Sequence, residues 1–196
     1  MVKIILPAVY IDKNVSFTDY FVYTKVQIKF ANNYFTAEGM KITLLLSGKT
    51  EDEYLTKGIT KYTGRLVHYI PFEIIVVPSL KNSKNLAIEQ QKQKESEAFI
   101  KSIPAAGYVV LLDEHGKEFT SVAFSEFLQK QINSGVRNLY FIIGGPYGFS
   151  NEILQRADQL LSLSQMTFSH QMVRLLFVEQ LYRAFTILKN ESYHHF

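Results

Sequence analysis

From Met40 onward, short apolar segments alternate with longer amphipathic ones, and this alternation restricts the fold more than any other feature. The short segments are rich in branched and aromatic residues, as buried strands are. They are Ile42–Leu46, Phe72–Val77, Tyr108–Leu112 and Leu139–Ile143. Strands separated by helices form parallel sheets, because a parallel pair needs a crossover connection. We therefore predict an α/β domain, with a mostly parallel sheet and helices on both faces.

The segments between and after these strands have helical periodicity. The predicted helices are Asp52–His68, Leu86–Ile100, a helix capped by Ser121 and stopped by Gly135, Asn151–Leu160 capped by Ser150, and His170–Lys189. A polar loop, Ser79–Asn85, precedes the second helix, and a short strand-like piece lies at Leu161–Ser164. The many charges of Leu86–Ile100 are typical of a solvated helix face.

Composition places the chain among soluble globular proteins. Its 196 residues are 47% hydrophobic and 20% charged, enough for one domain with a real core. It has no cysteine, which excludes disulfides, thiol catalysis and cysteine-ligated zinc. The net charge of +3 permits an anionic partner without requiring one. The chain shows neither a signal peptide pattern nor a membrane-length apolar run, so we expect a cytoplasmic protein.

Residues 1–39 differ from the rest. They are rich in Tyr and Phe, lack helical periodicity and contain polar breaks. Two interpretations are open: an appended interaction segment, or a non-native extension translated from upstream of the true start. The strong strand that opens at Met40 favours the second interpretation. We therefore expect residues 40–196 to form a single domain.

Two segments interrupt the apolar pattern in ways that suggest a ligand. The glycine turn Gly144–Gly148 follows a predicted strand, and glycine permits close approach of a ligand to the backbone. It matches neither the dinucleotide-binding fingerprint nor a P-loop, and a tight turn without a ligand has a similar sequence. Leu163–Arg174 is polar and lies between two apolar segments. Because ligands bind beyond the carboxyl ends of parallel strands, we expect both segments to lie there with Leu112-Asp113.

The histidines do not form a metal site by their spacing. His68 and His115 are expected on the surface, and His194-His195 has no acidic or histidine partner at a ligand spacing. We therefore expect no metal. His170 and Arg174 are four residues apart and would share one face of a helix. They are either a basic site beside the ligand or a helix-capping histidine next to a solvent-exposed arginine.

Four motifs give the chain a resemblance to a known family. They are Phe141–Gly148 (FIIGGPYG), Leu161–Arg174 (LSLSQMTFSHQMVR), Glu179–Ala184 (EQLYRA) and the terminal Tyr193-His194. From Met40 to Phe196 the sequence resembles the ribosomal RNA large-subunit methyltransferase H family, a branch of the knotted, SPOUT-type methyltransferases. The order and spacing of the motifs match along this whole length.

The resemblance implies properties that the residue patterns alone do not. It implies a deep trefoil knot in the C-terminal part of the sheet, S-adenosylmethionine as the methyl donor bound in that knot, and a homodimer in which the partner's C-terminal end completes each site. The implied reaction is methylation of ring nitrogen N3 of a pseudouridine in helix 69 of 23S ribosomal RNA, within the assembled ribosome. Neither a metal nor a membrane is implied.

Site residues follow from the matching motifs. The resemblance implies that the donor is bound by Leu112, Gly144, Gly145, Leu163, Ser164, Gln165, Met166, Thr167 and Phe168. It assigns RNA binding to His170, Arg174, Tyr193 and His194. Among these, we take His194, Tyr193 and Arg174 as catalytic candidates, with His194 as the hypothetical base because imidazole titrates near neutrality.

One departure concerns the end of the chain. Family members often continue Tyr-His with Lys or Arg, whereas His195 and Phe196 follow here. A phosphate contact at this end would be weaker, or would depend on protonation of His195. Two alternative functions remain open: a knotted methyltransferase that acts on another RNA, and a non-catalytic RNA-binding assembly factor with the same fold. The intact Leu163–Phe168 and Gly144–Gly148 segments argue against the second.

Overall fold

The computed structural model describes residues 39–78 and 86–195. The predicted extension at residues 1–39, except Gly39, and the predicted loop Ser79–Asn85 lie outside the described residues. Strands and helices alternate as the sequence predicts. In chain order they are β1 (Lys41–Ser47), α1 (Glu53–Leu66), β2 (Phe72–Val77), α2 (Ile88–Ser102), β3 (Tyr108–Glu118), α3 (Ser121–Asn133), β4 (Asn138–Ile143), α4 (Asn151–Arg156), β5 (Gln159–Ser162) and α5 (His170–Leu188).

The five strands form one parallel sheet in the order β2-β1-β4-β3-β5. This confirms the predicted parallel sheet. The central strands β1 and β4 are almost entirely buried, which explains their near-continuous apolar sequences. β2 and β5 form the two edges.

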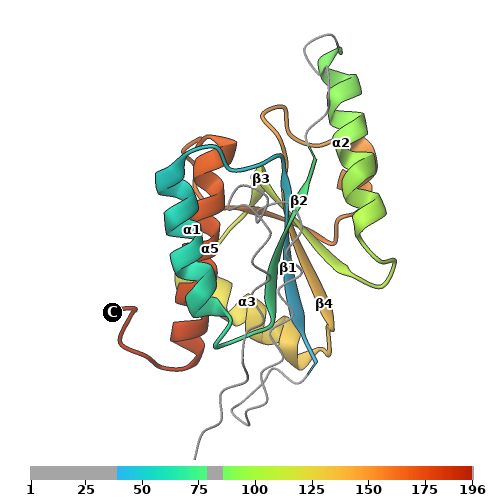
Figure 1. Cartoon of the computed structure of the whole chain (residues 1–196). Helices are drawn as coiled ribbons and strands as arrows, with labels where there is room; N and C mark the ends of the chain where they lie inside the picture. Colours follow the sequence, from blue (N-terminus) through green and yellow to red (C-terminus); the bar gives the residue numbers. More distant parts are fainter. Residues whose placement is uncertain (1–38, 79–85, 196) are drawn as a thin grey trace, which may run out of the picture. The chain divides into compact units, whose positions relative to one another are not determined.

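Helices cover both faces of the sheet (Figure 1). Because side chains alternate along a strand, neighbouring residues enter different cores. Leu44 packs in the core that contains Phe177 of α5, whereas Leu45 packs in the core that contains Phe99 of α2. On the first side α5 contacts both α1 and α3, and on the second α2 contacts α4.

Two element boundaries differ from the prediction. The helix predicted to reach Leu160 ends at Arg156, because Asp158 leaves the helix and its carboxylate accepts a 2.7 Å hydrogen bond from the N–H of Val109. β5 therefore begins at Gln159, earlier than the predicted strand-like piece. The cap of α3 is Thr120 rather than Ser121, and its hydroxyl accepts from the N–H of Ala123 at 3.1 Å.

β3 continues to Glu118, well beyond its predicted end at Leu112. Two separate parts of β3 pair with β5, since both Leu112 and Lys117 are in register with Leu161. Between these two points Gly116 lies against the β5 backbone. A Cβ atom at Gly116 would be only 2.5 Å from the nitrogen of Leu161. This close crossing of two backbones requires glycine.

The Gly116 crossing generates a stability prediction. Gly116→Ala should destabilise the fold by about 2 kcal/mol or more, because the clash is with backbone that cannot rotate away. Urea unfolding followed by circular dichroism would measure the change. Gly64→Ala is the control: Gly64 lies in α1 with open space at its Cβ position, so alanine should stabilise by up to about 1 kcal/mol. Equal stabilities of wild type and Gly116→Ala would contradict the predicted clash.

Candidate functional site

Strand register brings three predicted site segments to one edge of the sheet. Leu112 of β3 is in register with Ile143 of β4 on one side and with Leu161 of β5 on the other. The glycine turn leaves β4 directly after Ile143, and Leu163 follows β5. All three segments therefore lie at the carboxyl edge, where open parallel sheets bind ligands.

The glycine turn is shaped by its own hydrogen bond and by its neighbours. The N–H of Gly148 donates to the carbonyl of Gly145 at 3.2 Å, and Gly148 has a φ of +76°, which favours glycine. Gly144 is buried, and a Cβ there would lie 3.1 Å from the ring of Phe149. Gly145 has another neighbour: its N–H donates to the carboxylate of Glu95 on α2 at 3.2 Å. The conformation of the turn is thus determined by contacts within the chain.

Local hydrogen bonds organise the segment Leu163–Phe168, which we call the donor loop. The hydroxyl of Ser162 donates to the carbonyl of Ser164 at 3.0 Å, and the Ser164 hydroxyl accepts from the N–H of Met166 at 2.9 Å. These bonds fold the loop tightly at its start. The side chain of Met166 remains 73% exposed.

The donor loop is also tied to the far part of β3. Gln165 donates to Glu118 at 3.3 Å, and the hydroxyl of Thr167 donates to Glu114 at 3.4 Å. The loop thereby leaves Phe168, like Met166, exposed at the same edge. Exposed apolar side chains beside polar backbone suit a ligand that has a flat apolar part and hydrogen-bonding groups.

Arg174 is completely buried, with 0% of its surface exposed. Its guanidinium donates to the carbonyl of Ser47 at 2.6 Å, and to the carbonyl of Gly48 and the hydroxyl of Thr50 at 3.1 Å each. These bonds fasten α5 to the end of β1. Burial lowers the pKa of Arg174, and the charge of Glu51 opposes that change. This burial does not favour the predicted contact of Arg174 with RNA phosphate, because the side chain is enclosed and both of its terminal nitrogens already bind the protein.

His170 is the first residue of α5 and follows the donor loop closely. Burial lowers its pKa, and the positive charge of Arg174 lowers it further, whereas Glu51 and Glu95 raise it. The neutral imidazole is therefore favoured. Its Nε2 lies 3.3 Å from Nε2 of Gln171. Of the predicted RNA-binding residues, His170 and Arg174 follow the donor loop directly in sequence, in the first two turns of α5.

Tyr193 and His194 lie against the second half of α5. The Tyr193 hydroxyl donates to Glu179 at 3.0 Å, and burial raises its pKa, helped by hydrogen bonds to Tyr62 and Glu179. Arg183 binds Glu179 at 2.7 Å, and its Nη1 lies 3.4 Å from Nδ1 of His194. We call these four residues, Glu179, Arg183, Tyr193 and His194, the C-terminal cluster.

Within a single chain, the C-terminal cluster lies apart from the donor loop. Arg183 comes nine residues after Arg174 on the same helix, which corresponds to about 13 Å along the axis. The tail residues that contact Arg183 are therefore well removed from the start of α5. The structure brings together the predicted donor residues, but it separates them from Tyr193 and His194.

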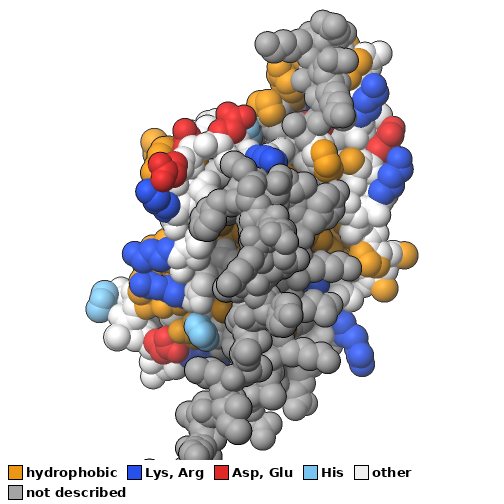
Figure 2. Space-filling model, viewed as in Figure 1, with side chains coloured by type: hydrophobic (Ala, Val, Ile, Leu, Met, Phe, Trp, Pro, Cys, Tyr) orange, Lys and Arg blue, Asp and Glu red, His pale blue; other side chains and the backbone are white. Residues whose placement is uncertain are grey.

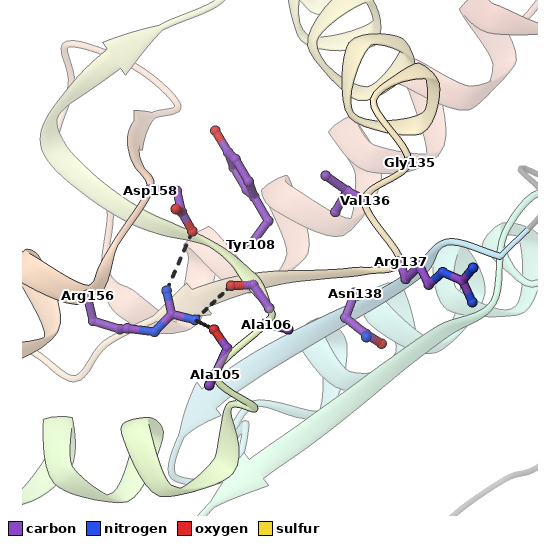
Figure 3. Close-up of a pocket in the computed structure, with 10 residues that line it drawn as sticks. Ala105, Ala106, Tyr108, Gly135, Val136, Arg137, Asn138, Arg156 and Asp158 are labelled. Atoms are coloured by element: carbon purple, nitrogen blue, oxygen red, sulfur yellow. Dashed lines mark hydrogen bonds and ion pairs between the residues drawn. The ribbon is translucent and has the colours of Figure 1, made fainter.

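A pocket of about 520 Å³ lies at the opposite edge of the sheet, around the first residues of β3 and β4 (Figure 3). Arg156 donates to the carbonyls of Pro104, Ala105 and Gly107 and lies 3.6 Å from the carboxylate of Asp158. The charged groups of the pocket, Arg156 and Asp158, thus hold together the loops that precede β3 and β5. None of the predicted site residues lines this pocket.

Comparison with known proteins places the chain in a family. A family model described as "Predicted SPOUT methyltransferase" matches residues 40–194. A protein named ribosomal RNA large subunit methyltransferase H, from Christiangramia forsetii, is 57% identical over 156 residues, covering 80% of this chain and 99% of the relative. The chain belongs to the ribosomal RNA large subunit methyltransferase H family, within the SPOUT methyltransferases.

Other methyltransferases of the same name show a similar match. Those of Flavobacterium johnsoniae and Parabacteroides distasonis are 56% and 54% identical, each over 156 residues, with 80% of this chain and 99% of the relative covered. The resemblance found from the sequence motifs is therefore confirmed. Among the described residues no helix is long and apolar enough to cross a membrane.

Three residues near the predicted site of this methyltransferase were missed as functional candidates. The charged sequence of its helix predicts that Glu95 lies on a solvated face, yet it is half-buried and hydrogen-bonded to the glycine turn. Glu179 and Arg183 belong to a motif that carries the resemblance, but the sequence does not show that they hold the chain end. A carboxylate on an exposed helix has no pattern that identifies such a long-range partner.

The burial of Arg174 generates a second prediction. Arg174→Met should destabilise the methyltransferase by about 3 kcal/mol, because three acceptors at the end of β1 lose a charged donor. Urea unfolding would measure it. Arg137→Met, at an exposed position, serves as the control and should change stability by no more than about 0.5 kcal/mol. Similar losses in the two variants would contradict the anchoring role of Arg174.

Proposed function

We propose that this chain transfers a methyl group from S-adenosylmethionine to ring nitrogen N3 of a pseudouridine in helix 69 of 23S ribosomal RNA, within the assembled ribosome. The observation that carries the proposal is the meeting of Leu112, Gly144 and the donor loop at one sheet edge, in a chain 57% identical to a named ribosomal RNA methyltransferase. Such a protein acts in the cytoplasm.

The residues at this edge fit the donor. Leu112 and Leu163 are half-buried apolar side chains, and Met166 and Phe168 are exposed beside them in the chain. They would hold adenine, and backbone amides of the donor loop would bind its edge. Ser164, Gln165 and Thr167 complete the loop, and Gly144 and Gly145 border it. When bound, S-adenosylmethionine supplies an electrophilic methyl group.

A trefoil knot is part of the proposal. The double passage of β3 along β5, with Gly116 against the backbone of Leu161, supports it. Such a crossing packs β3 closely against the strand that leads into the donor loop. A knotted loop would be rigid, so the donor would meet a preorganised site.

We also propose a homodimer in which the partner's chain end completes each site. The separation of Tyr193 and His194 from the donor loop within one chain supports this arrangement, because both groups are needed beside the acceptor base. Residues 1–39 would remain outside the catalytic domain. The family match begins at residue 40, which supports that division.

The RNA would bind along the face that carries the C-terminal cluster. α1 bears Lys57, Lys61 and Arg65, and basic side chains line the edge of the molecule over this helix in Figure 2. Tyr62 of α1 lies 3.3 Å, hydroxyl to hydroxyl, from Tyr193. Basic residues would contact phosphates, while Tyr193 or His170 would stack on a base displaced from the RNA loop. Arg174 would contribute indirectly, by holding the start of α5 in place.

In the proposed mechanism His194 takes the proton that N3 carries, so that the nitrogen lone pair becomes available. Arg183 would hold the tail against α5, since its guanidinium lies 3.4 Å from Nδ1 and is itself held by Glu179. Because a guanidinium only donates, Nδ1 would leave this contact when its lone pair takes the proton. Tyr193 would keep the tail in place through Glu179. The side chains thus supply proton transfer and alignment.

The function can be tested with radiolabelled S-adenosylmethionine. The purified protein should transfer label to assembled ribosomes that lack this methylation, and mass spectrometry of nuclease fragments should locate it on N3 of the helix 69 pseudouridine. Free large subunits and transfer RNA are the comparison substrates, and each should gain little label. Absence of label in ribosomes, or preferential labelling of transfer RNA, would refute the proposed substrate.

His194→Ala should lower single-turnover methylation by about 100-fold or more, the usual contribution of a general base. Affinity for S-adenosylmethionine, measured by calorimetry, should change little because the proposed role of His194 is to take a proton from the acceptor base and not to bind the donor. His68→Ala, at an exposed position, is the control. Unchanged turnover in His194→Ala would remove this residue from the mechanism.

A further inference from the structure

Glu95 occupies a place at the proposed donor site that its helix alone does not explain. α2 lies on the opposite face of the sheet from α5, and most of its charged side chains are exposed (Figure 1). Glu95 instead reaches the glycine turn and accepts the N–H of Gly145 at 3.2 Å. A Cβ at Gly145 would lie 2.7 Å from one carboxylate oxygen and 2.8 Å from the other. Glycine at this position therefore makes room for a carboxylate of the chain itself.

Residues before and after Glu95 in α2 make contacts that fix its position. The next residue, Ser96, is buried, and its hydroxyl accepts from the N–H of Ser150 at 3.2 Å. Two residues before Glu95, Gln93 donates to Glu152 of α4 at 2.7 Å. These contacts fix the register of α2 against the segment that follows the glycine turn. The Glu95 carboxylate is therefore a fixed charge rather than a mobile surface group.

The negative charge at this edge is not neutralised by a direct partner. Within residues 39–78 and 86–195, neither Glu95 nor Glu51 forms an ion pair. Both act on the ring of His170 at the start of α5. Burial lowers the pKa of His170, and the positive charge of Arg174 acts on the same ring with a larger effect than either carboxylate and lowers it further. The nearby cation, Arg174, is enclosed by the carbonyl and hydroxyl groups it binds.

We propose that the Glu95 carboxylate makes the site selective for the positively charged methyl donor over its neutral product. This inference rests on the proposed function. S-adenosylmethionine carries a sulfonium, whereas S-adenosylhomocysteine has a neutral thioether in its place, and the two molecules are otherwise alike except for the methyl group. A fixed negative charge therefore stabilises the first and not the second. Loss of the positive charge on methyl transfer would weaken binding of the product and speed its release.

The expected size of this effect follows from Coulomb's law. At an effective dielectric constant of about 20, one unit charge within roughly 12 Å of another changes a binding constant about ten-fold. Glu95 is partly exposed, so solvent screening reduces this value. We expect a change of about five- to ten-fold in the ratio of donor affinity to product affinity.

Glu95→Gln tests the inference, because the amide oxygen of glutamine can still accept the N–H of Gly145 while the charge is lost. Calorimetry with S-adenosylmethionine and with S-adenosylhomocysteine should show donor affinity reduced about five- to ten-fold and product affinity unchanged. Unchanged product affinity also shows that the site is folded. Glu97→Gln on the same helix removes an equal charge from an exposed position and should leave the ratio as in wild type.

The outcomes separate the two proposals. If the wild-type protein binds neither molecule, the proposed donor site itself is wrong. If it binds both, but Glu95→Gln leaves the affinity ratio unchanged or weakens both molecules equally, electrostatic selectivity by Glu95 is overturned. An equal change in the ratio for Glu97→Gln would also overturn it, because the effect would then come from net charge. In ribosome methylation, the inhibition constant of S-adenosylhomocysteine relative to the KM of the donor should fall in Glu95→Gln alone.

Discussion

The pairing of β3 with two neighbours at once is the constraint on which the candidate site depends. Backbone hydrogen bonds place Leu112 level with Ile143 on one side and Leu161 on the other. In a parallel sheet this register also decides which loops emerge together. The glycine turn and the donor loop are far from Leu112 along the chain, yet they meet it because Leu112 is level with the last residue of β4 and with Leu161 near the end of β5. A slip in register would separate them.

The charges at this edge are arranged around that backbone framework. Arg174 is buried and its two terminal nitrogens donate to two carbonyls and a hydroxyl, so it ties α5 to the end of β1. Glu95 reaches the same edge from the opposite face and binds the glycine turn. Both side chains make contacts across elements distant in sequence. Arg174 thus ties the elements together from within, whereas the Glu95 carboxylate stands at the glycine turn without an ion-pair partner among the described residues.

The end of the chain is held by a separate set of contacts. Tyr193 and His194 are held by Glu179 and Arg183 on the second half of α5. An internal network of this kind orders the tail before any RNA arrives, which reduces the entropy lost on binding. It also keeps the tail away from the chain's own donor loop. The proposed homodimer resolves this separation, since a partner would bring its tail to a neighbouring donor site.

The sequence by itself determined the architecture and the family. Buried parallel strands have continuous apolar sequences, helices have their own period, and the motifs around Gly144–Gly148 and Leu163–Phe168 identify the methyltransferase family. Local patterns do not show how long-range partners meet. Only the tertiary structure decided that β3 continues past Gly116, that Arg174 is an anchor, and that Glu95 contacts the glycine turn. Each of these depends on contacts between segments distant in the chain, which leave no periodic signal.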